Sequence, residues 1–250
     1  MFKTHKHRLG MIVIFAIIPF LFIAQKKNSL VTIEINHRVN DKALVLDDST
    51  YLNSFGQVYT ISKFNYYIGK LKLHEESGKI VEFNDYHLIK EEKPSSKSFD
   101  LKNVQPGKYK SIEFILGVDS IDNCSGAQSD DLDPIYGMFW TWNTGYIFLK
   151  LEGNSIESSA IGNTLEYHIG GYKPPTNSIR TIEIMFEEPL IINNNGNAKI
   201  ELNVNIDKLL HHTNKIDFSV NPILNTPQQA KLIADNYQYI FELININNAE

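Results

Sequence analysis

The sequence predicts an all-β fold, an antiparallel β-sandwich with a short C-terminal helix. Three observations support this prediction: apolar residues alternate with polar ones in several short segments, Gly, Asn and Pro turns separate these segments, and one segment near the end has helical spacing. Of the 250 residues, 42% are hydrophobic and 21% are charged, which is enough apolar material for one sizeable core.

The N-terminal half contributes four predicted strands. In the first of them, every second residue is apolar and His37 is the next residue in that series, so we expect this histidine on the buried face. Burying an imidazole without a hydrogen-bond partner costs roughly 1–3 kcal/mol, so one interpretation of His37 is a core histidine whose polar atoms are satisfied. The predicted strands cover residues 31–37, 64–73, 80–89 and 112–116.

The C-terminal half continues the pattern and ends in a helix. A long aromatic run at residues 138–151 is broken by Asn143-Thr144-Gly145, a tripeptide typical of a hairpin turn or bulge. Thr226 and Pro227 are suited to the start of a helix, and apolar residues then recur with helical spacing. The further predicted strands cover residues 165–169, 182–187 and 200–206. The apolar stripe of the predicted helix consists of Ala230, Ile233, Ala234, Tyr237 and Phe241.

Residues 1–24 are predicted to be a secretory signal peptide, which leaves residues 25–250 as a single domain. Three basic residues precede an apolar stretch at 11–24, which is shorter than the roughly 20 residues that span a bilayer. We therefore expect a periplasmic or secreted protein without a membrane span in the mature chain. The single cysteine excludes a disulfide scaffold, and the net charge of −5 disfavours nucleic-acid binding.

Motifs of common enzymes are absent from the sequence, which contains no P-loop, no G-x-S-x-G, no H-E-x-x-H and no G-x-G-x-x-G. We therefore expect a binding protein and not an enzyme. One rival is a glycosidase that uses the acidic loop containing Asp119 and Asp133, which requires two carboxyl groups within about 5–10 Å across an open cleft. The same loop is a candidate calcium site, because carboxylates in a turn-rich loop can ligate Ca²⁺, or else it is a solvated acidic loop.

The two tryptophans, Trp140 and Trp142, lie two residues apart, so strand geometry places them on one face. Such a pair fills either the core or a site. Exposed tryptophans would stack on sugar rings, and the alternative function is therefore a carbohydrate- or surface-binding β-sandwich. His168 lies on the face of its strand opposite to that of its apolar neighbours, so we expect it to be exposed or to face a site. His87 flanks a predicted hairpin and is expected at the surface.

A set of short segments, spread over about residues 30–245, occurs in a characteristic order. They are Ile35-Asn36-His37, Tyr66-Tyr67-Ile68, Tyr86-His87-Leu88-Ile89, Gly117-Val118-Asp119-Ser120, Leu132-Asp133-Pro134, Gly137-Met138-Phe139-Trp140-Thr141-Trp142-Asn143-Thr144-Gly145-Tyr146, Lys150-Leu151-Glu152-Gly153 and Tyr167-His168-Ile169-Gly170-Gly171. In this order they resemble the MbnP-like copper-binding family, the methanobactin-associated periplasmic proteins and their relatives. The joined run over residues 117–153 is the specific part of the resemblance.

The resemblance implies a secreted β-sandwich that binds copper. In characterised relatives, histidines hold copper together with kynurenine, an oxidised tryptophan that a di-haem, peroxidase-like enzyme produces. Carried over by position, Trp140 is the candidate for this modification and Trp142 is the second candidate, while His37 and His168 are the candidate imidazole ligands. In some relatives a histidine lies two residues after the modified tryptophan, where this chain has Trp142, so that ligand is either missing or supplied elsewhere.

The predicted function is therefore copper binding in copper acquisition or handling. Imidazole suits both Cu(I) and Cu(II), and each ligating histidine should have a hydrogen-bond acceptor that fixes its tautomer. Asp119 and Asp133 are the candidates for that role, and His87 is a further supporting residue. The hypothesis requires His37, His168 and Trp140 to converge in space.

Overall fold

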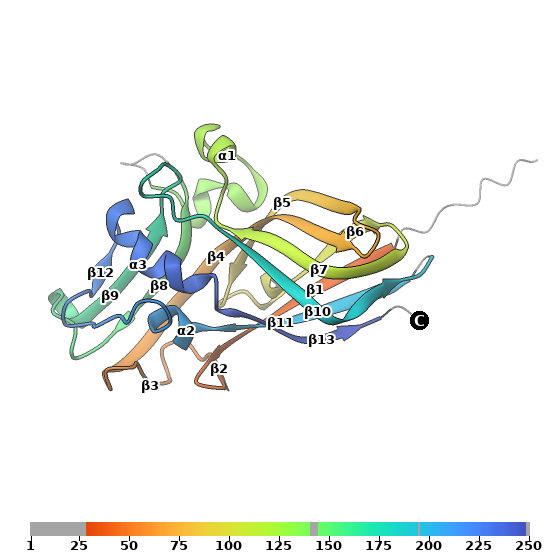
Figure 1. Cartoon of the computed structure of the whole chain (residues 1–250). Coiled ribbons are helices and arrows are strands. Elements are labelled where there is room, and N and C mark those ends of the chain that lie inside the picture. Colours follow the sequence, from red (N-terminus) through yellow and green to blue (C-terminus); the bar gives the residue numbers. More distant parts are fainter. Residues whose placement is uncertain (1–28, 141–144, 195, 249–250) are drawn as a thin grey trace, which may run out of the picture.

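The computed structural model describes residues 29–140, 145–194 and 196–248, which form two packed β-sheets with short helices (Figure 1). Buried apolar residues from both sheets and from the last helix join in one core. The predicted β-sandwich is confirmed. The predicted signal peptide and Trp142 lie outside the described residues.

The first sheet has the strand order β13-β11-β1-β2, with β6 also paired to β1. Its first strand, β1 (Ser29–Val39), alternates apolar and polar residues and buries the apolar set. This strand lies parallel to β11 (Asn197–Asn205) and antiparallel to β2 (Lys42–Ala43) and β6 (Ser98–Val104). The last strand, β13 (Phe241–Asn247), pairs antiparallel with β11 at the edge.

The second sheet has the order β10-β7-β4-β8-β9-β12, with β3 and β5 also paired to β4. Its long central strand β4 pairs with β8 along its first part and with β7 along its second, and its pairing with β5 shifts register at a bulge between Gly69 and Leu71. The strands are β3 (Tyr51–Leu52), β4 (Val58–Glu75), β5 (Ile80–Lys90), β7 (Gly107–Leu116), β8 (Ile147–Asn154), β9 (Thr164–Gly170), β10 (Arg180–Ile192) and β12 (Ile223–Leu224).

Two of the strand pairs are parallel, β1 with β11 and β9 with β12, whereas we expected antiparallel pairing throughout. The alternation of apolar residues identifies the buried face of a strand, but it carries no information about the direction of the neighbouring strand. The sandwich was therefore predictable, and these two pairings were not.

The helices of the described residues are short and lie in the connections. They are η1 (Pro94–Lys97), α1 (Ser120–Cys124), η2 (Asp130–Leu132), η3 (Pro134–Tyr136), η4 (Ile161–Asn163), α2 (Ile206–Leu210) and α3 (Pro227–Tyr237). Within the described ranges, no helix combines the length and the apolar character that crossing a membrane requires. The helix α1 lies in the connection from β7 towards β8 (Figure 1).

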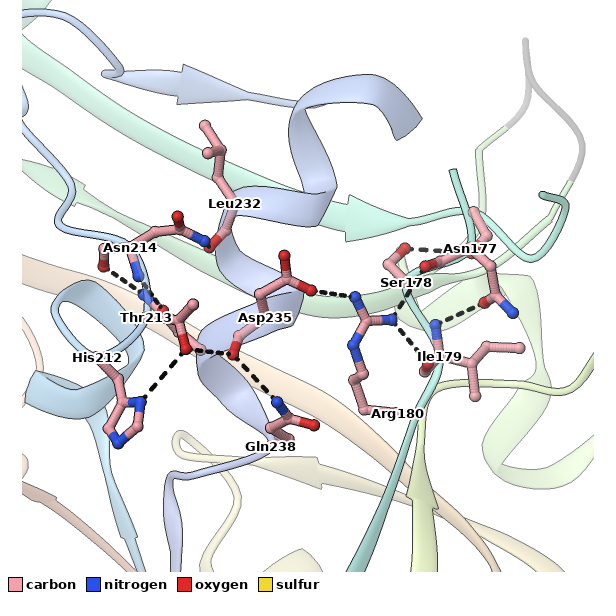
Figure 2. Close-up of polar contacts among 12 residues, drawn as sticks. Asn177, Ser178, Ile179, Arg180, His212, Thr213, Asn214, Leu232, Asp235 and Gln238 are labelled. Carbon is pink, nitrogen blue, oxygen red and sulfur yellow. Dashed lines mark hydrogen bonds and ion pairs between the residues drawn. The ribbon is translucent and has the colours of Figure 1, made fainter. Parts of the chain in front are cut away.

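The predicted C-terminal helix is confirmed as α3, which packs on β9 through its buried apolar stripe. Polar contacts also fix α3 to the start of β10 and to the loop after α2, since Arg180 pairs with Asp235 and Thr213 donates to the Asp235 carbonyl (Figure 2). Our assignment of Phe241 to the helix is wrong, because the helix ends at Tyr237 and Phe241 begins β13. The spacing from Tyr237 to Phe241 suits a helix, but pairing with β11 determines the structure there.

Candidate functional site

His37 lies between the two sheets, and both of its ring nitrogens have protein partners. Its Nδ1 is 2.7 Å from Glu91 Oε2, its Nε2 is 2.8 Å from the Tyr66 hydroxyl, and its ring packs edge-on against Phe64. The residue is only 3% exposed. A neutral imidazole that donates from Nδ1 to the carboxylate and accepts the tyrosine proton at Nε2 satisfies all three groups. In this arrangement no lone pair remains for a metal ion.

Burial controls the protonation of this cluster. Burial lowers the pKa of His37 below its usual value, although the Glu91 carboxylate opposes the change. Burial by itself would raise the pKa of Glu91, but hydrogen bonds from His37 and from Lys97 Nζ, which is 2.7 Å away, bring it below its usual value. The favoured state is thus a neutral His37 beside an ionised Glu91.

His168 lies in β9 and contacts two carboxylates. Its Nε2 is 2.8 Å from Glu152 Oε1, and its Nδ1 is 3.5 Å from Glu166 Oε1, which is beyond normal hydrogen-bond distance. The hydrogen bond from His168 lowers the pKa of Glu152 to about 2, so this carboxylate is ionised near neutral pH. With the proton on Nε2, Nδ1 offers a lone pair to a ligand.

The strand register places His168 and His37 on opposite faces of the second sheet. Tyr66, which bonds His37, lies opposite Leu149 in β8, whereas His168 lies opposite the next residue, Lys150. Consecutive strand residues point to opposite faces, so the sheet itself separates the two imidazoles. The expected convergence of His37 and His168 on one ion is contradicted by this arrangement.

Trp140, in contrast, lies against the strand that carries His168. The indole is 2% exposed, and a Cβ added to Gly170 would lie 2.7 Å from its Cζ3, so only glycine leaves room for the ring. Gly170 follows His168 by two residues in β9, and the pairing of β9 with β8 shifts register beside it. Within the described residues, the indole Nε1 has no hydrogen-bond partner. The structure therefore places Trp140 against the strand that carries His168, two residues from that histidine.

The segment around Trp140 is a hairpin in its described part. Phe139 bridges Tyr146, Trp140 N donates to the Gly145 carbonyl at 3.2 Å, and Ile147 N donates to the Met138 carbonyl at 2.9 Å. This pairing agrees with the predicted turn, of which Gly145 is described. Because Trp140 is buried, it cannot stack on a sugar, so this residue does not support the alternative function of carbohydrate binding.

Asp119 and Asp133 act as helix caps rather than as partners of histidine. Asp119 accepts from Asp122 N at 2.8 Å and lies 3.4 Å from Lys70 Nζ, and Asp133 accepts from Ile135 N at 2.9 Å. Our assignment of both as acceptors for the ligand histidines is therefore wrong. Across the described ranges, no group of three or more His, Cys, Asp or Glu is arranged to hold a metal ion. The calcium and glycosidase hypotheses gain no support from these contacts.

His87 contacts neither His168 nor Trp140 in the structure. Its ring stacks on Phe99 of β6 with the centroids 3.8 Å apart, and burial lowers its pKa. It lines a pocket on β5 with Asp131. The supporting role that we expected for His87 is therefore not seen.

Sequence reasoning missed the residues that contact the two histidines. Glu91 bonds His37, whereas Glu152 and Glu166 face His168. Lys150, opposite His168 in the register, donates through Nζ to the Gly137 carbonyl at 2.6 Å, at the base of the Trp140 hairpin. Burial lowers the pKa of Lys150. A correct pairing of β8 with β9 would have identified Glu152, Glu166 and Lys150, since all lie in or between these strands.

Comparisons with known proteins identify the family. The family model described as MbnP matches residues 28–228. Among solved structures, MbnP from Methylosinus trichosporium is similar, with a TM-score of 0.54 and 13% sequence identity over 77% of this chain and 80% of that chain. At this identity the likeness concerns the fold alone. A search of curated proteins yields no match. Because the family model covers most of its length, the chain belongs to the MbnP family.

Proposed function

We propose that this chain is an exported copper-binding protein whose metal site forms around His168 once Trp140 has been oxidised to kynurenine. The observation that carries the proposal is the packing of Trp140 against Gly170, two residues from His168 in the same strand. Family membership supports the class of protein. The proposed role is copper acquisition or handling.

His168 fits the role of an imidazole ligand. Glu152 accepts a hydrogen bond from Nε2, which fixes the tautomer and leaves Nδ1 for the metal, as is usual for ligating histidines. Glu166 lies on the Nδ1 side at 3.5 Å and can add a carboxylate oxygen. His37 does not fit, because both of its nitrogens are bonded inside the core.

Without the modification, the described part of the chain offers too few donors for tight binding. The described residues contain no three-residue metal cluster, and an indole presents no lone pair to a metal. Kynurenine would add an aryl amine and a ketone at the position of Trp140. We therefore expect copper affinity to depend on the modification.

The modification has a defined chemical balance. Two oxygen atoms, from dioxygen or from two equivalents of hydrogen peroxide, cleave the C2–C3 bond of the indole, and water then releases the former C2 as formate. The side chain loses one carbon and gains one oxygen, so the mass rises by about 4 Da. We propose that a di-haem, peroxidase-like enzyme supplies the oxidising equivalents.

Anaerobic Cu(I) titration of natively secreted and unmodified recombinant protein tests the proposal, with tandem mass spectrometry to locate kynurenine. We expect the modified protein to bind more tightly than about micromolar and the unmodified protein to bind far more weakly. His168→Asn should abolish tight binding, whereas His212→Asn, at an exposed histidine stacked on Tyr239, should leave it unchanged. Weak binding by fully modified protein, or tight binding by the His168 variant, would refute the proposal.

The proposed location rests on the pattern at residues 1–24. N-terminal sequencing of protein recovered from the periplasm or the medium tests it. A start near residue 25 supports export with cleavage, and a product confined to the cytoplasm contradicts it.

A further inference from the structure

We propose that Asn123 is a positioning residue that holds the hairpin of Trp140 against β9. This role rests on the proposed function and deepens it, because it concerns how the Trp140 indole is packed on the strand that carries His168. The proposal begins from a buried amide side chain that links α1 to the hairpin.

Asn123 is 5% exposed and uses both ends of its amide. Its Nδ2 donates to the carbonyls of Val118 and Asp119, while its Oδ1 accepts from Tyr146 N at 2.9 Å. The donated bonds fix the side chain to the start of its own helix. The accepted bond fixes the returning strand of the hairpin, so Asn123 joins α1 directly to that strand.

Gly145 makes this contact possible and transmits it to Trp140. Its φ is +118°, and a Cβ at this position would lie 2.6 Å from Asn123 Oδ1, so glycine is required both for the backbone angle and for the close approach. The Gly145 carbonyl accepts the backbone N–H of Trp140 at 3.2 Å. The Gly145 carbonyl and the Tyr146 N–H belong to one peptide group, so Asn123 and Trp140 bond opposite sides of the same peptide.

The helix that carries Asn123 is itself fixed to the second sheet. An isolated helix of five residues is unstable in water, so α1 needs contacts from the sheet. Lys70 supplies one from a bulge in β4, where its φ is +51°, and its Nζ is 2.9 Å from Asp122 Oδ2. The Tyr86 hydroxyl donates to the same carboxylate at 2.9 Å. The sheet thus fixes α1, and α1 fixes the hairpin.

Asn236 provides a matched control for the loss of a buried amide. It is 0% exposed, its Oδ1 accepts from Asn214 N at 2.7 Å, and its Nδ2 donates to the carbonyls of Leu209 and Asn214. It joins α3 to the loop that contains Asn214, a region visible in Figure 2. None of these contacts involves the hairpin of Trp140.

The experiment measures the environment of Trp140 in unmodified protein that carries Trp142→Phe, so that Trp140 is the sole indole. Asn123→Ala should shift the fluorescence emission to the red and raise the acrylamide quenching constant about fivefold or more, because losing a buried bond opens the hairpin locally. Asn236→Ala should leave both quantities within about twofold of the parent, even where its unfolding free energy falls equally. Unchanged quenching in a folded Asn123→Ala protein, or equal changes in both variants, would overturn the proposal.

Gly145→Ala disturbs the same contact from the hairpin side, because the added methyl would overlap Asn123 Oδ1. It replaces Asn123→Ala as the test if that variant does not fold. It should also expose Trp140, and in the double variant the two changes should be strongly non-additive, because both disrupt one contact. Additive changes would contradict a shared role. These measurements involve no copper, so their failure refutes the positioning role alone. Absence of copper binding in the unsubstituted modified protein refutes only the proposed function.

Discussion

His37 and His168 both lie in β-strands of one sandwich, yet their surroundings differ in kind. His37 lies between the sheets, where one carboxylate and one tyrosine occupy both of its nitrogens. His168 lies on the other face of the second sheet, where Glu152 holds one nitrogen and the other has no partner at normal hydrogen-bond distance. Burial turns the first imidazole into a structural link, and partial exposure leaves the second available for a ligand.

The comparison shows that the partners of a histidine, more than its presence in a family pattern, determine what it can do. Both histidines lie in segments that resemble the same family. Only one of them retains a nitrogen that a metal can reach without breaking a buried hydrogen-bond network. The following predictions test this difference, beginning with the largest expected effect.

Replacing His37 by Ala should destabilise the fold by about 3 kcal/mol, because Glu91 and the Tyr66 hydroxyl lose their partner inside the core. Urea unfolding followed by circular dichroism measures the change. The matched variant His168→Ala, at a more exposed site, should cost about 1 kcal/mol or less. Equal losses in the two variants would remove the distinction between the histidines.

Gly170→Ala should destabilise the fold by roughly 1–3 kcal/mol, because the added methyl overlaps the Trp140 ring and the Tyr146 carbonyl. It should also shift the fluorescence of Trp140. Gly78→Ala is a suitable control, since it lies in an exposed turn with open space around it and suffers only from its positive φ. Unchanged Trp140 fluorescence in Gly170→Ala would mean that the indole does not pack on β9.

Glu152→Gln should weaken copper binding by the modified protein about tenfold, since the second partner of a ligating histidine typically contributes 10–100-fold. The amide can still accept from His168 Nε2, but it lacks the negative charge. Glu91→Gln makes the same change beside His37 and should leave copper affinity unaltered. Isothermal titration with Cu(I) compares the pair, and a loss in the Glu91 variant would indicate that His37 participates after all.

Stability should fall as the pH decreases, and the His37 cluster should contribute the first part of that fall. The pKa of folded His37 lies below the usual 6.5, so the unfolded chain binds the proton first and stability declines as the pH drops below about 6.5. The pKa of folded Glu91 lies below the usual 4.5, so its contribution is lost at still lower pH. Unfolding between pH 8 and 4 should show a flatter profile for His37→Gln, and an unchanged profile would exclude His37 as the cause.

The order of the segments and the alternation of apolar residues made the fold class predictable. The same alternation placed His37 on a buried face and His168 on the opposite parity, as the structure has them. The two histidines nevertheless do not converge as a joint copper site requires. The alternation of residues places each histidine on one face of its own strand, but it does not tell which other strands lie next to that face. Asp119 and Asp133 were misassigned for a related reason, since a polar loop sequence does not distinguish a helix cap from a carboxylate that accepts a hydrogen bond from a ligating histidine.

Local periodicity and turn residues were enough to predict the β-sandwich, the helix that begins at Pro227 and a turn or bulge after Trp140. The position of Glu152 beside His168 and the packing of Trp140 on Gly170 became visible only in the folded protein. Such neighbours depend on the pairing of strands that are distant or reversed along the chain, and this pairing is selected by the packing of the whole core rather than by any local pattern.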